Sequence, residues 1–357
     1  MTRKQIQSRN DLTADLLGTN QQVQRRAIAK AITLLESTRA DHSAKADGML
    51  AALLPHTGRA FRLGLSGVPG VGKSTLIEAL GLYLIDQGLR VAVLTIDPSS
   101  TVSGGSILGD KTRMEKLSVH ARAYIRPSPS SGTLGGVAEK TREAMLVCES
   151  AGYDVVIVET VGVGQSEVAV AGMTDMFVLM QLPNAGDELQ AIKKGVMELA
   201  DLVLINKADL DTDAATRAQA QITSSLRLLG QQGNPANAHH DQDVWHPQVL
   251  VLSALLGQGV DNLWAVVTTF RKLQTANGKL LARRKQQSLS WMWERVEAGL
   301  RQAFREDPLV RSRLAAITQA VTQGRVVASS AARELLGLFA QSHGALGTEP
   351  GHTGAGA

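Results

Sequence analysis

Residues 67–74 have the clearest chemical pattern in this chain. Their sequence, GVPGVGKS, matches the spacing G-x-x-x-x-G-K-[ST]. Glycines let a backbone fold tightly around an anion, so that its N–H groups point at phosphate oxygens. An apolar run at 61–65 precedes the loop and a helical pattern at 75–84 follows it, which is the context expected of a phosphate-binding loop. The alternative, a plain glycine turn between a strand and a helix, is disfavoured by the Lys-Ser pair.

Each part of this loop has an expected role. A helix that begins at Lys73 directs its free N–H groups and the positive end of its dipole at the phosphates. The Lys73 ammonium reaches the β- and γ-phosphates, and the Ser74 hydroxyl binds Mg²⁺. The residues predicted to bind the nucleotide here are Gly67, Val68, Pro69, Gly70, Val71, Gly72, Lys73, Ser74 and Thr75.

Acidic residues follow two later apolar runs. Asp97 comes directly after the run 91–96, and Glu159 follows the run 154–158 as the acid of a Walker B pattern. Carboxylates at such positions are suited to hold Mg²⁺ or its water ligands. Many GTPases have Asp-x-x-Gly at the second place, whereas this chain has Glu-x-x-Gly. Gln165 is a candidate for positioning a water molecule, and a solvated loop amide is an equal alternative.

Two polar loops have the composition of nucleotide-dependent switches. The loop 103–113 combines glycines with charged side chains, which suits a segment that closes over the γ-phosphate. Arg113 is a candidate for stabilising charge in the transition state, and the alternative is a surface arginine paired with Asp110. The second loop, 182–195, follows the apolar run 176–181 and is either a solvated turn or a third switch.

Residues 206–209 (NKAD) follow the apolar run 202–205 and match the pattern N-K-x-D. The Asp209 carboxylate accepts two hydrogen bonds from N1–H and N2–H₂ of guanine. Adenine offers neither donor, so it would leave the carboxylate unpaired at a cost of about 1–3 kcal/mol. Asn206 braces the site, and the stem of Lys207 covers the base. Backbone N–H groups towards guanine O6 are expected from Ser253, Ala254 and Leu255.

The elements that must position these groups alternate between short apolar runs and helical stretches. Several runs are apolar throughout, which is typical of a parallel sheet covered by helices on both faces. Ligands of such sheets bind at the carboxyl ends of the strands, where these motifs lie. The sequence therefore predicts an α/β protein with the P-loop NTPase fold and a mostly parallel sheet flanked by helices. The expected strands are 62–65, 91–96, 123–125, 154–158, 176–181, 202–205 and 249–252.

Helical extensions are expected on both sides of the nucleotide-binding domain, which spans 61–275. Residues 1–60 form the N-terminal extension, which includes a short helix at 49–54 that ends at Pro55. Residues 276–341 form a C-terminal helical arm, and the tail 342–357 is rich in glycine and expected to be disordered. The arm presents one apolar face, made of Leu289, Met292, Val296 and Leu300.

Composition narrows the class of protein. The 357 residues carry a net charge of +4, but the excess is spread along the chain, and aromatic residues are only 3%. Both features argue against nucleic-acid binding. The densest basic cluster, 283–285 (RRK), is expected to be a solvated helix face. The single cysteine, Cys148, allows no internal disulfide, and no apolar run reaches membrane-spanning length, so the expected location is the cytosol without membrane contact.

Together, these motifs resemble the MeaB/ArgK-type methylmalonyl-CoA mutase-associated GTPases. The likeness covers about residues 25–340, and the polar stretch 231–247 and the tail depart from it. The segments that carry the likeness are GVPGVGKST, DPSS, SGGSILGDKTRM, IRPSPSSGTLGG, YDVVIVETVGVGQSE, GDELQAIKKG, NKAD and SAL.

The resemblance implies a homodimeric P-loop GTPase that docks on an adenosylcobalamin-dependent acyl-CoA mutase. It implies that the GTPase gates loading of the mutase cofactor and protects the mutase, and that the C-terminal arm forms the dimer. It places Arg113 in the first switch. It also implies that the third switch couples the state of the nucleotide to the mutase. The Mg²⁺ site would consist of Ser74, Asp97, Asp110 and Glu159, and the third switch would include Asp187, Gln190 and Lys193.

Two other functions stay open. A nickel-inserting GTPase would need a cluster of metal ligands, but the eight histidines are scattered and His239-His240 is their only adjacent pair. An ATP-dependent kinase of an amino-acid transport system is the other alternative, and the N-K-x-D pattern argues against it.

Overall fold

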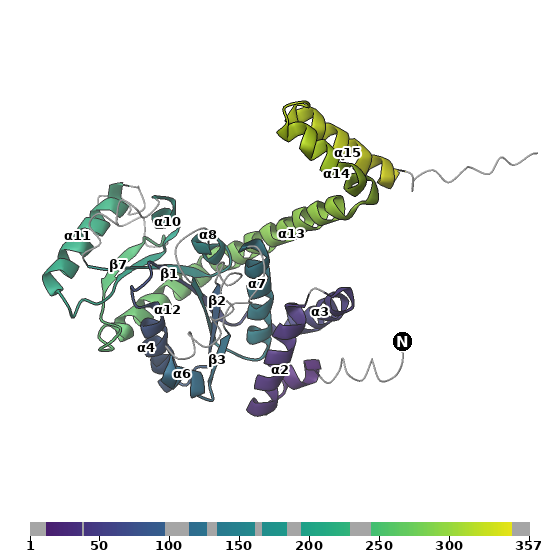
Figure 1. The fold of residues 1–357 in the computed structure, drawn as a ribbon. Helices are drawn as coiled ribbons and strands as arrows, with labels where there is room; N and C mark the ends of the chain where they lie inside the picture. The colour runs from purple at the N-terminus through teal and green to yellow at the C-terminus, as the bar shows by residue number, and fades with distance from the viewer. Residues whose placement is uncertain are drawn as a thin grey trace, which may run out of the picture. The chain divides into compact units, whose positions relative to one another are not determined.

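The computed structural model describes residues 12–37, 39–96, 114–126, 134–160, 166–183, 194–228 and 244–344. The chain divides into two compact units, Met1–Lys285 and Gln286–Ala357. The first unit holds a seven-stranded sheet of order β3-β2-β4-β1-β5-β6-β7, in which each neighbouring pair is parallel (Figure 1). The strands are β1 (Phe61–Gly67), β2 (Val91–Ile96), β3 (Ala123–Arg126), β4 (Val155–Thr160), β5 (Met176–Gln181), β6 (Leu202–Ile205) and β7 (Gln248–Val251).

All seven expected strands are present, so the predicted α/β fold is confirmed. The clearest difference lies in β4, which was expected to stop at Val158 with the acid just beyond it. Glu159 instead lies inside the strand, because it pairs in register with Leu65 of β1 and with Thr95 of β2. Asp154 falls outside the strand, and its carboxylate accepts a hydrogen bond from the Arg90 N–H at 2.8 Å.

Helices cover both faces of the sheet in the first unit (Figure 1). On one face, α4 and α12 pack over the apolar side chains of the central strands, together with α6. On the other face, α7 and α8 contact β4, and α8 also contacts β1 and β5. The helices are α4 (Lys73–Asp86), α6 (Glu115–Val119), α7 (Leu134–Ser150), α8 (Ser166–Ala171), α10 (Lys194–Leu199), α11 (Thr212–Leu228) and α12 (Val260–Ala276).

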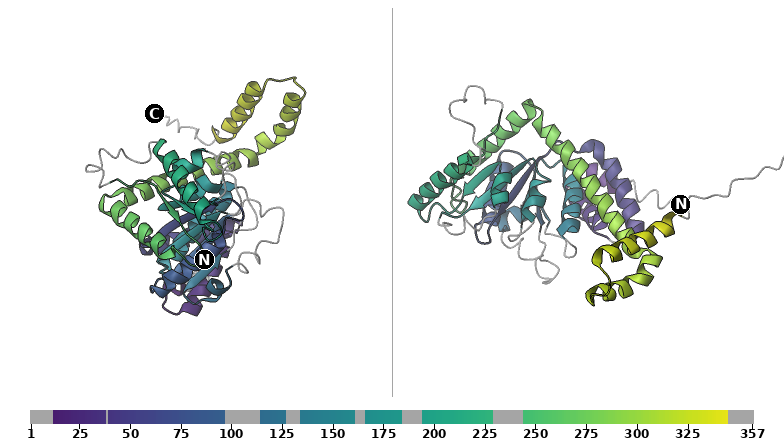
Figure 2. Two further views of the ribbon diagram at one scale, coloured as in Figure 1. Left: turned by 90° about the vertical axis from the view of Figure 1, so that its left-hand side faces the viewer. Right: turned by 90° about the horizontal axis from the view of Figure 1, so that it is seen from above.

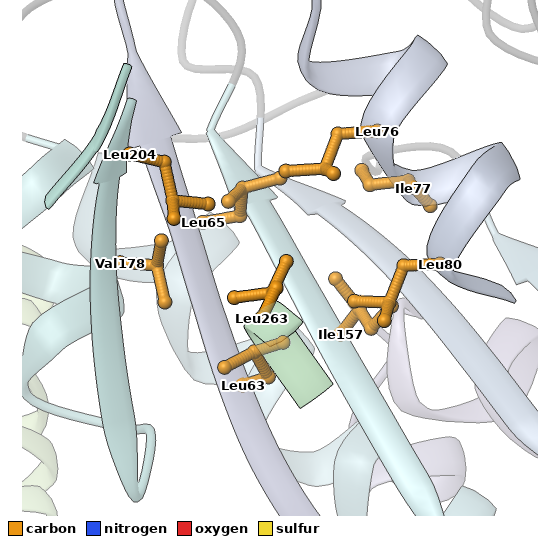
Figure 3. A pocket seen from close by; sticks show the side chains of 9 residues that line it. All are labelled: Leu63, Leu65, Leu76, Ile77, Leu80, Ile157, Val178, Leu204 and Leu263. Carbon is orange, nitrogen blue, oxygen red and sulfur yellow. The ribbon is translucent and has the colours of Figure 1, made fainter. Parts of the chain in front are cut away.

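The core beneath α4 is closely packed and aliphatic. It encloses one small cavity of about 10 Å³, which Figure 3 shows from close by. An ordered water needs several polar partners, and this lining offers no polar side chain, so the cavity is expected to be dry. The lining residues are Leu63, Leu65, Leu76, Ile77, Leu80, Ile157, Val178, Leu204 and Leu263.

The N-terminal helices α2 (Gln21–Leu35) and α3 (Ala40–Leu53) pack against α7 (Figure 1). The short helix expected at 49–54 is the end of the longer α3, and Pro55 lies in the 3₁₀ turn η1 (Leu54–His56) that follows. Gln24 anchors α2, because its side chain donates to the carbonyls of Leu16 and Gly18 and accepts from Arg90 Nη2 at 2.6 Å.

The prediction of a solvated basic face at 283–285 is wrong for two of its three residues. Arg284 Nε donates to Asp175 Oδ1 at 2.7 Å, and Arg283 Nη1 donates to Asp201 Oδ2 at 3.0 Å. The reason is that these aspartates precede β5 and β6, at the sheet edge on which the first turns of α13 (Lys279–Glu306) lie. Burial raises the pKa of Asp201 above its ordinary value, and the neighbouring Arg283 opposes that shift.

The second unit contains the rest of α13 with α14 (Pro308–Thr322) and α15 (Ala328–Gly344). The helices α14 and α15 lie side by side, as Figure 2 shows in yellow. Asp307 caps α14 by accepting a hydrogen bond from the Val310 N–H at 2.9 Å, and the rings of Phe304 and Phe339 meet edge to face. Across the part of the chain that the structure describes, no helix is long and apolar enough to cross a membrane.

Candidate nucleotide-binding site

The loop between β1 and α4 has the backbone geometry of an anion cradle. Gly72 has φ 95°, and a Cβ at this position would lie 2.5 Å from Asn206 Nδ2. Any other residue would therefore displace Asn206 as well as strain the backbone. Lys73 Nζ donates to the carbonyl oxygens of Gly67 at 2.8 Å and Val68 at 3.3 Å. The ammonium is thus held against the loop that is expected to receive the phosphates.

Asn206 ties the two halves of the site together. Its side chain is 2% exposed; Nδ2 donates to the Val71 carbonyl at 2.7 Å, and Oδ1 accepts the Ala254 N–H at 2.9 Å. Its own N–H donates to the carbonyl of Gln181, the last residue of β5, at 2.9 Å. One buried side chain therefore fixes the phosphate-binding loop against the segment expected to read the base.

Residues 207–209 are partly or fully exposed, so a ligand can reach them. Lys207 has φ 62°, a conformation that costs a residue with a side chain about 1–2 kcal/mol. Such strain persists where surrounding contacts impose it, often at functional sites. The N–H of Ala208 donates to the Leu252 carbonyl at 3.2 Å, which holds the turn beside β7. Asp209 is exposed, so its carboxylate is accessible to a base.

Residues 253–255 lie next to Asn206, but their N–H groups are partly engaged. Ser253 and Ala254 are buried, and their N–H groups donate to the carbonyl of Gln258 and to Asn206 Oδ1. A contact from either group to guanine O6 would require it to leave that acceptor. Leu255 is 77% exposed.

The residues near the loop fit a magnesium ion. Ser74 lies in the first turn of α4, and Glu159 is 4% exposed, in register with Leu65 two residues before the loop. A hydroxyl and a carboxylate are hard oxygen donors of the kind that Mg²⁺ prefers. Seven predicted site residues lie outside the described residues: Asp97, Asp110, Arg113, Gln165, Asp187, Gln190 and Lys193.

The structure adds polar residues that sequence reasoning missed. Gln181 ends the apolar strand β5 and Ser166 begins α8, and both are buried. A glutamine at the end of an otherwise apolar strand was the available signal. Within the described ranges, no group of three or more His, Cys, Asp or Glu residues is placed to hold a metal ion, and His239-His240 lies outside those ranges.

The parallel sheet carries a G-K-S loop after its central strand and an N-K-x-D segment after β6, and the asparagine of that segment is hydrogen-bonded to the loop. This combination defines a P-loop protein that binds guanine nucleotides. The family model described as methylmalonyl Co-A mutase-associated GTPase MeaB matches residues 28–308. This chain belongs to that family and is a GTPase, so the resemblance seen in its motifs is confirmed.

Individual relatives agree with this assignment. A Caulobacter vibrioides protein named as a GTPase is 55% identical over 315 residues, which cover 88% of this chain and 94% of that protein. GTPase ArgK of Escherichia coli is 49% identical over 278 residues, covering 77% and 81% of the two chains. A mouse protein named methylmalonic aciduria type A homolog, mitochondrial, is 45% identical over 331 residues, covering 90% and 78%.

A solved structure shows the same fold. The crystal structure titled LAO/AO transport system kinase superposes with a TM-score of 0.70 at 35% sequence identity. The match covers 95% of this chain and 99% of that one.

Proposed function

We propose that this GTPase is a chaperone of an adenosylcobalamin-dependent acyl-CoA mutase, methylmalonyl-CoA mutase or a relative. In this role it couples GTP hydrolysis to cofactor loading and to protection of the mutase, and it acts in the cytosol. Family membership supports the mutase as partner. The observation that carries nucleotide binding is Asn206, whose side chain joins the phosphate-binding loop to the guanine-reading segment at 2.7 and 2.9 Å.

Some residues of the nucleotide site are proposed to bind GTP, and others to stabilise charge during hydrolysis. Lys73 exchanges the loop carbonyls that it now contacts for the β- and γ-phosphates, and Asp209 accepts the guanine N–H groups. Mg²⁺, when bound, neutralises developing charge on the phosphates, and Ser74 and Glu159 with Asp97 and Asp110 would hold it. Arg113 stabilises transition-state charge, and Gln165 orients the attacking water.

Coupling to the mutase is assigned to the segment after β5. The carboxyl end of β5 lies beside the nucleotide site, because Met180 is in register with Gly67 of the phosphate-binding loop. Asp187, Gln190 and Lys193 follow in the chain and are proposed to form the third switch. Coupling free energies between two sites are typically about 1–3 kcal/mol, enough to make the mutase respond to the bound nucleotide.

The apolar face of α13 is the proposed dimer contact. Four side chains at helical spacing are 42–58% exposed in the single chain, although all are large and apolar. A second copy of the chain would remove them from water. The four are Leu289, Met292, Val296 and Leu300.

The dimer assignment is tested by charge on that face. Val296→Glu with Leu300→Glu should convert the dimer to a monomer in sedimentation equilibrium, because dimerisation would then bury two carboxylates. Ala298→Glu adds a charge at an exposed position about 165° around α13 from the centre of that face, and it should leave the dimer intact. An unchanged dimer in the double variant would contradict this contact.

The chaperone proposal is tested with purified mutase. The mutase should stimulate GTP hydrolysis by the wild-type chain, and loading of adenosylcobalamin should depend on whether GTP or GDP is bound. Lys193→Ala should leave intrinsic hydrolysis near normal and reduce the stimulation. Equal stimulation of the variant and the wild type would remove the third switch from the proposal. Loading of adenosylcobalamin at the same rate with GTP and with GDP would contradict the chaperone role.

A further inference from the structure

A layer of buried polar side chains lies under α8, on the sheet face opposite α4. Met180 belongs to the apolar core beneath α4, so Gln181, the next residue of β5, points to the α8 face. Ser66 and Thr160 lie on that face by the same alternation, and their hydroxyl oxygens are 2.9 Å apart. Ser166 is the first residue of α8, which packs on this face.

Two members of this layer lack the partners that buried polar groups normally have. Gln181 is 1% exposed, and no hydrogen-bond partner of its amide nitrogen or amide oxygen lies among the residues that the structure describes. Ser166 is fully buried, and its hydroxyl has no partner within the described ranges either. Buried side-chain polar groups are satisfied in the large majority of cases, so two exceptions on one sheet face need a physical reason.

The strand register and the position of α8 place these two residues on the same face of the sheet, near the carboxyl ends of β1 and β5. Gly64 of β1 allows α8 to approach closely, since a Cβ there would lie 2.8 Å from Val170 Cγ1. Ser166 is one helical turn, about 6 Å, before Val170, which brings it level with Ser66, two residues beyond Gly64. Ser66 pairs with Leu179, and Gln181 is two residues further along β5. Gln181 therefore lies about 7 Å further along the sheet and one strand over, and a shift of α8 together with the length of the glutamine side chain would have to close this gap.

We infer that Gln181 is a positioning residue that favours the GTP-bound arrangement by pairing its amide with the Ser166 hydroxyl. α8 is the first helix after β4, which carries Glu159, and GTPases rearrange the segment after this strand when the γ-phosphate binds. The amide is desolvated in both arrangements but satisfied in only one. Satisfaction of the Gln181–Ser166 pair then adds to the affinity for GTP and not to that for GDP.

The test compares nucleotide affinities of the whole protein without any mutase. Gln181→Met keeps the side-chain volume and removes the amide. We expect affinity for a non-hydrolysable GTP analogue to fall about three- to tenfold, with GDP affinity changed by less than about twofold. Ser166→Ala should give the same pattern, and the double variant should fall no further than either single change. An unchanged ratio of analogue to GDP affinity, or an equal loss of both, would overturn the proposal.

Gln24→Met is the matched control. Gln24 is also buried, but its amide is satisfied by Leu16, Gly18 and Arg90. This variant should lower the melting temperature by about 3–8 °C and leave the nucleotide ratio unchanged. Gln181→Met should leave the melting temperature unchanged or raise it. A drop like that of Gln24→Met would show that Gln181 is satisfied in the resting protein, for example by an ordered water, and would also overturn the proposal.

Discussion

Polar side chains at the amino and carboxyl ends of the strands differ in their hydrogen-bond partners. At the amino end, Asp175 is fully buried and accepts hydrogen bonds from the Arg62 N–H at 2.8 Å and from Arg284 Nε at 2.7 Å. The Arg62 guanidinium pairs with Glu149 at 2.5 Å, and Arg283 pairs with Asp201. These charges satisfy one another inside the protein.

At the carboxyl end, some polar groups are open to a ligand or lack a partner among the residues that the structure describes. Asp209 is exposed, and Lys73 rests on carbonyls of its own loop. Gln181 and Ser166 are buried with no partner among the residues described. The difference indicates that the polar groups at the amino end stabilise the fold, whereas those at the carboxyl end bind a nucleotide. Substitutions at the amino end should therefore change stability, and those at the carboxyl end should change binding.

The largest effect is expected at the amino end. Asp175→Ala leaves the Arg284 guanidinium without its carboxylate, so the free energy of unfolding should fall by about 3–5 kcal/mol in urea titration. GTP affinity of the folded fraction should stay within about twofold of wild type. Asp41→Ala is the control, because Asp41 pairs with Arg39 at the surface, and its unfolding transition should stay close to that of wild type. A similar small change for Asp175→Ala would contradict the structural role of this end.

Lys73→Ala should show the reverse pattern. Removing a charged donor to the phosphates should weaken binding of a GTP analogue about 10- to 150-fold in calorimetry. The unfolding transition should stay close to that of wild type. Lys30→Ala, which removes an exposed lysine of α2, should change neither quantity. Tight GTP binding by the Lys73 variant would refute the loop assignment.

Asp209→Asn should change which base is bound. The asparagine amide cannot accept both guanine N–H groups, so affinity for GTP should fall about 5- to 150-fold. Xanthosine triphosphate should bind better than it does to wild type, because its C2 carbonyl accepts the new amide N–H. Competition binding measures both effects, and Asp213→Asn, an exposed residue of α11, serves as control. An unaltered base preference would remove Asp209 from the guanine site.

Much of this arrangement could be predicted from local sequence. Apolar runs located all seven strands, and the spacing of Gly67 to Ser74 and of Asn206 to Asp209 set the order of the motifs along the sheet. The pairing of Arg283 with Asp201 could not be predicted, since it joins residues 82 positions apart and a basic run looks solvated in isolation. That Gln181 has no partner among the described residues could not be predicted either, because it depends on how closely α8 packs over Gly64.

The central claim is that one guanine nucleotide spans the Gly67–Ser74 loop and Asp209. Equilibrium competition against labelled GTP tests it most directly. GDP and unlabelled GTP should displace the label, and ATP should need a concentration about 5- to 150-fold higher than that of GTP to displace the same fraction. Displacement by ATP at equal concentration would contradict the claim.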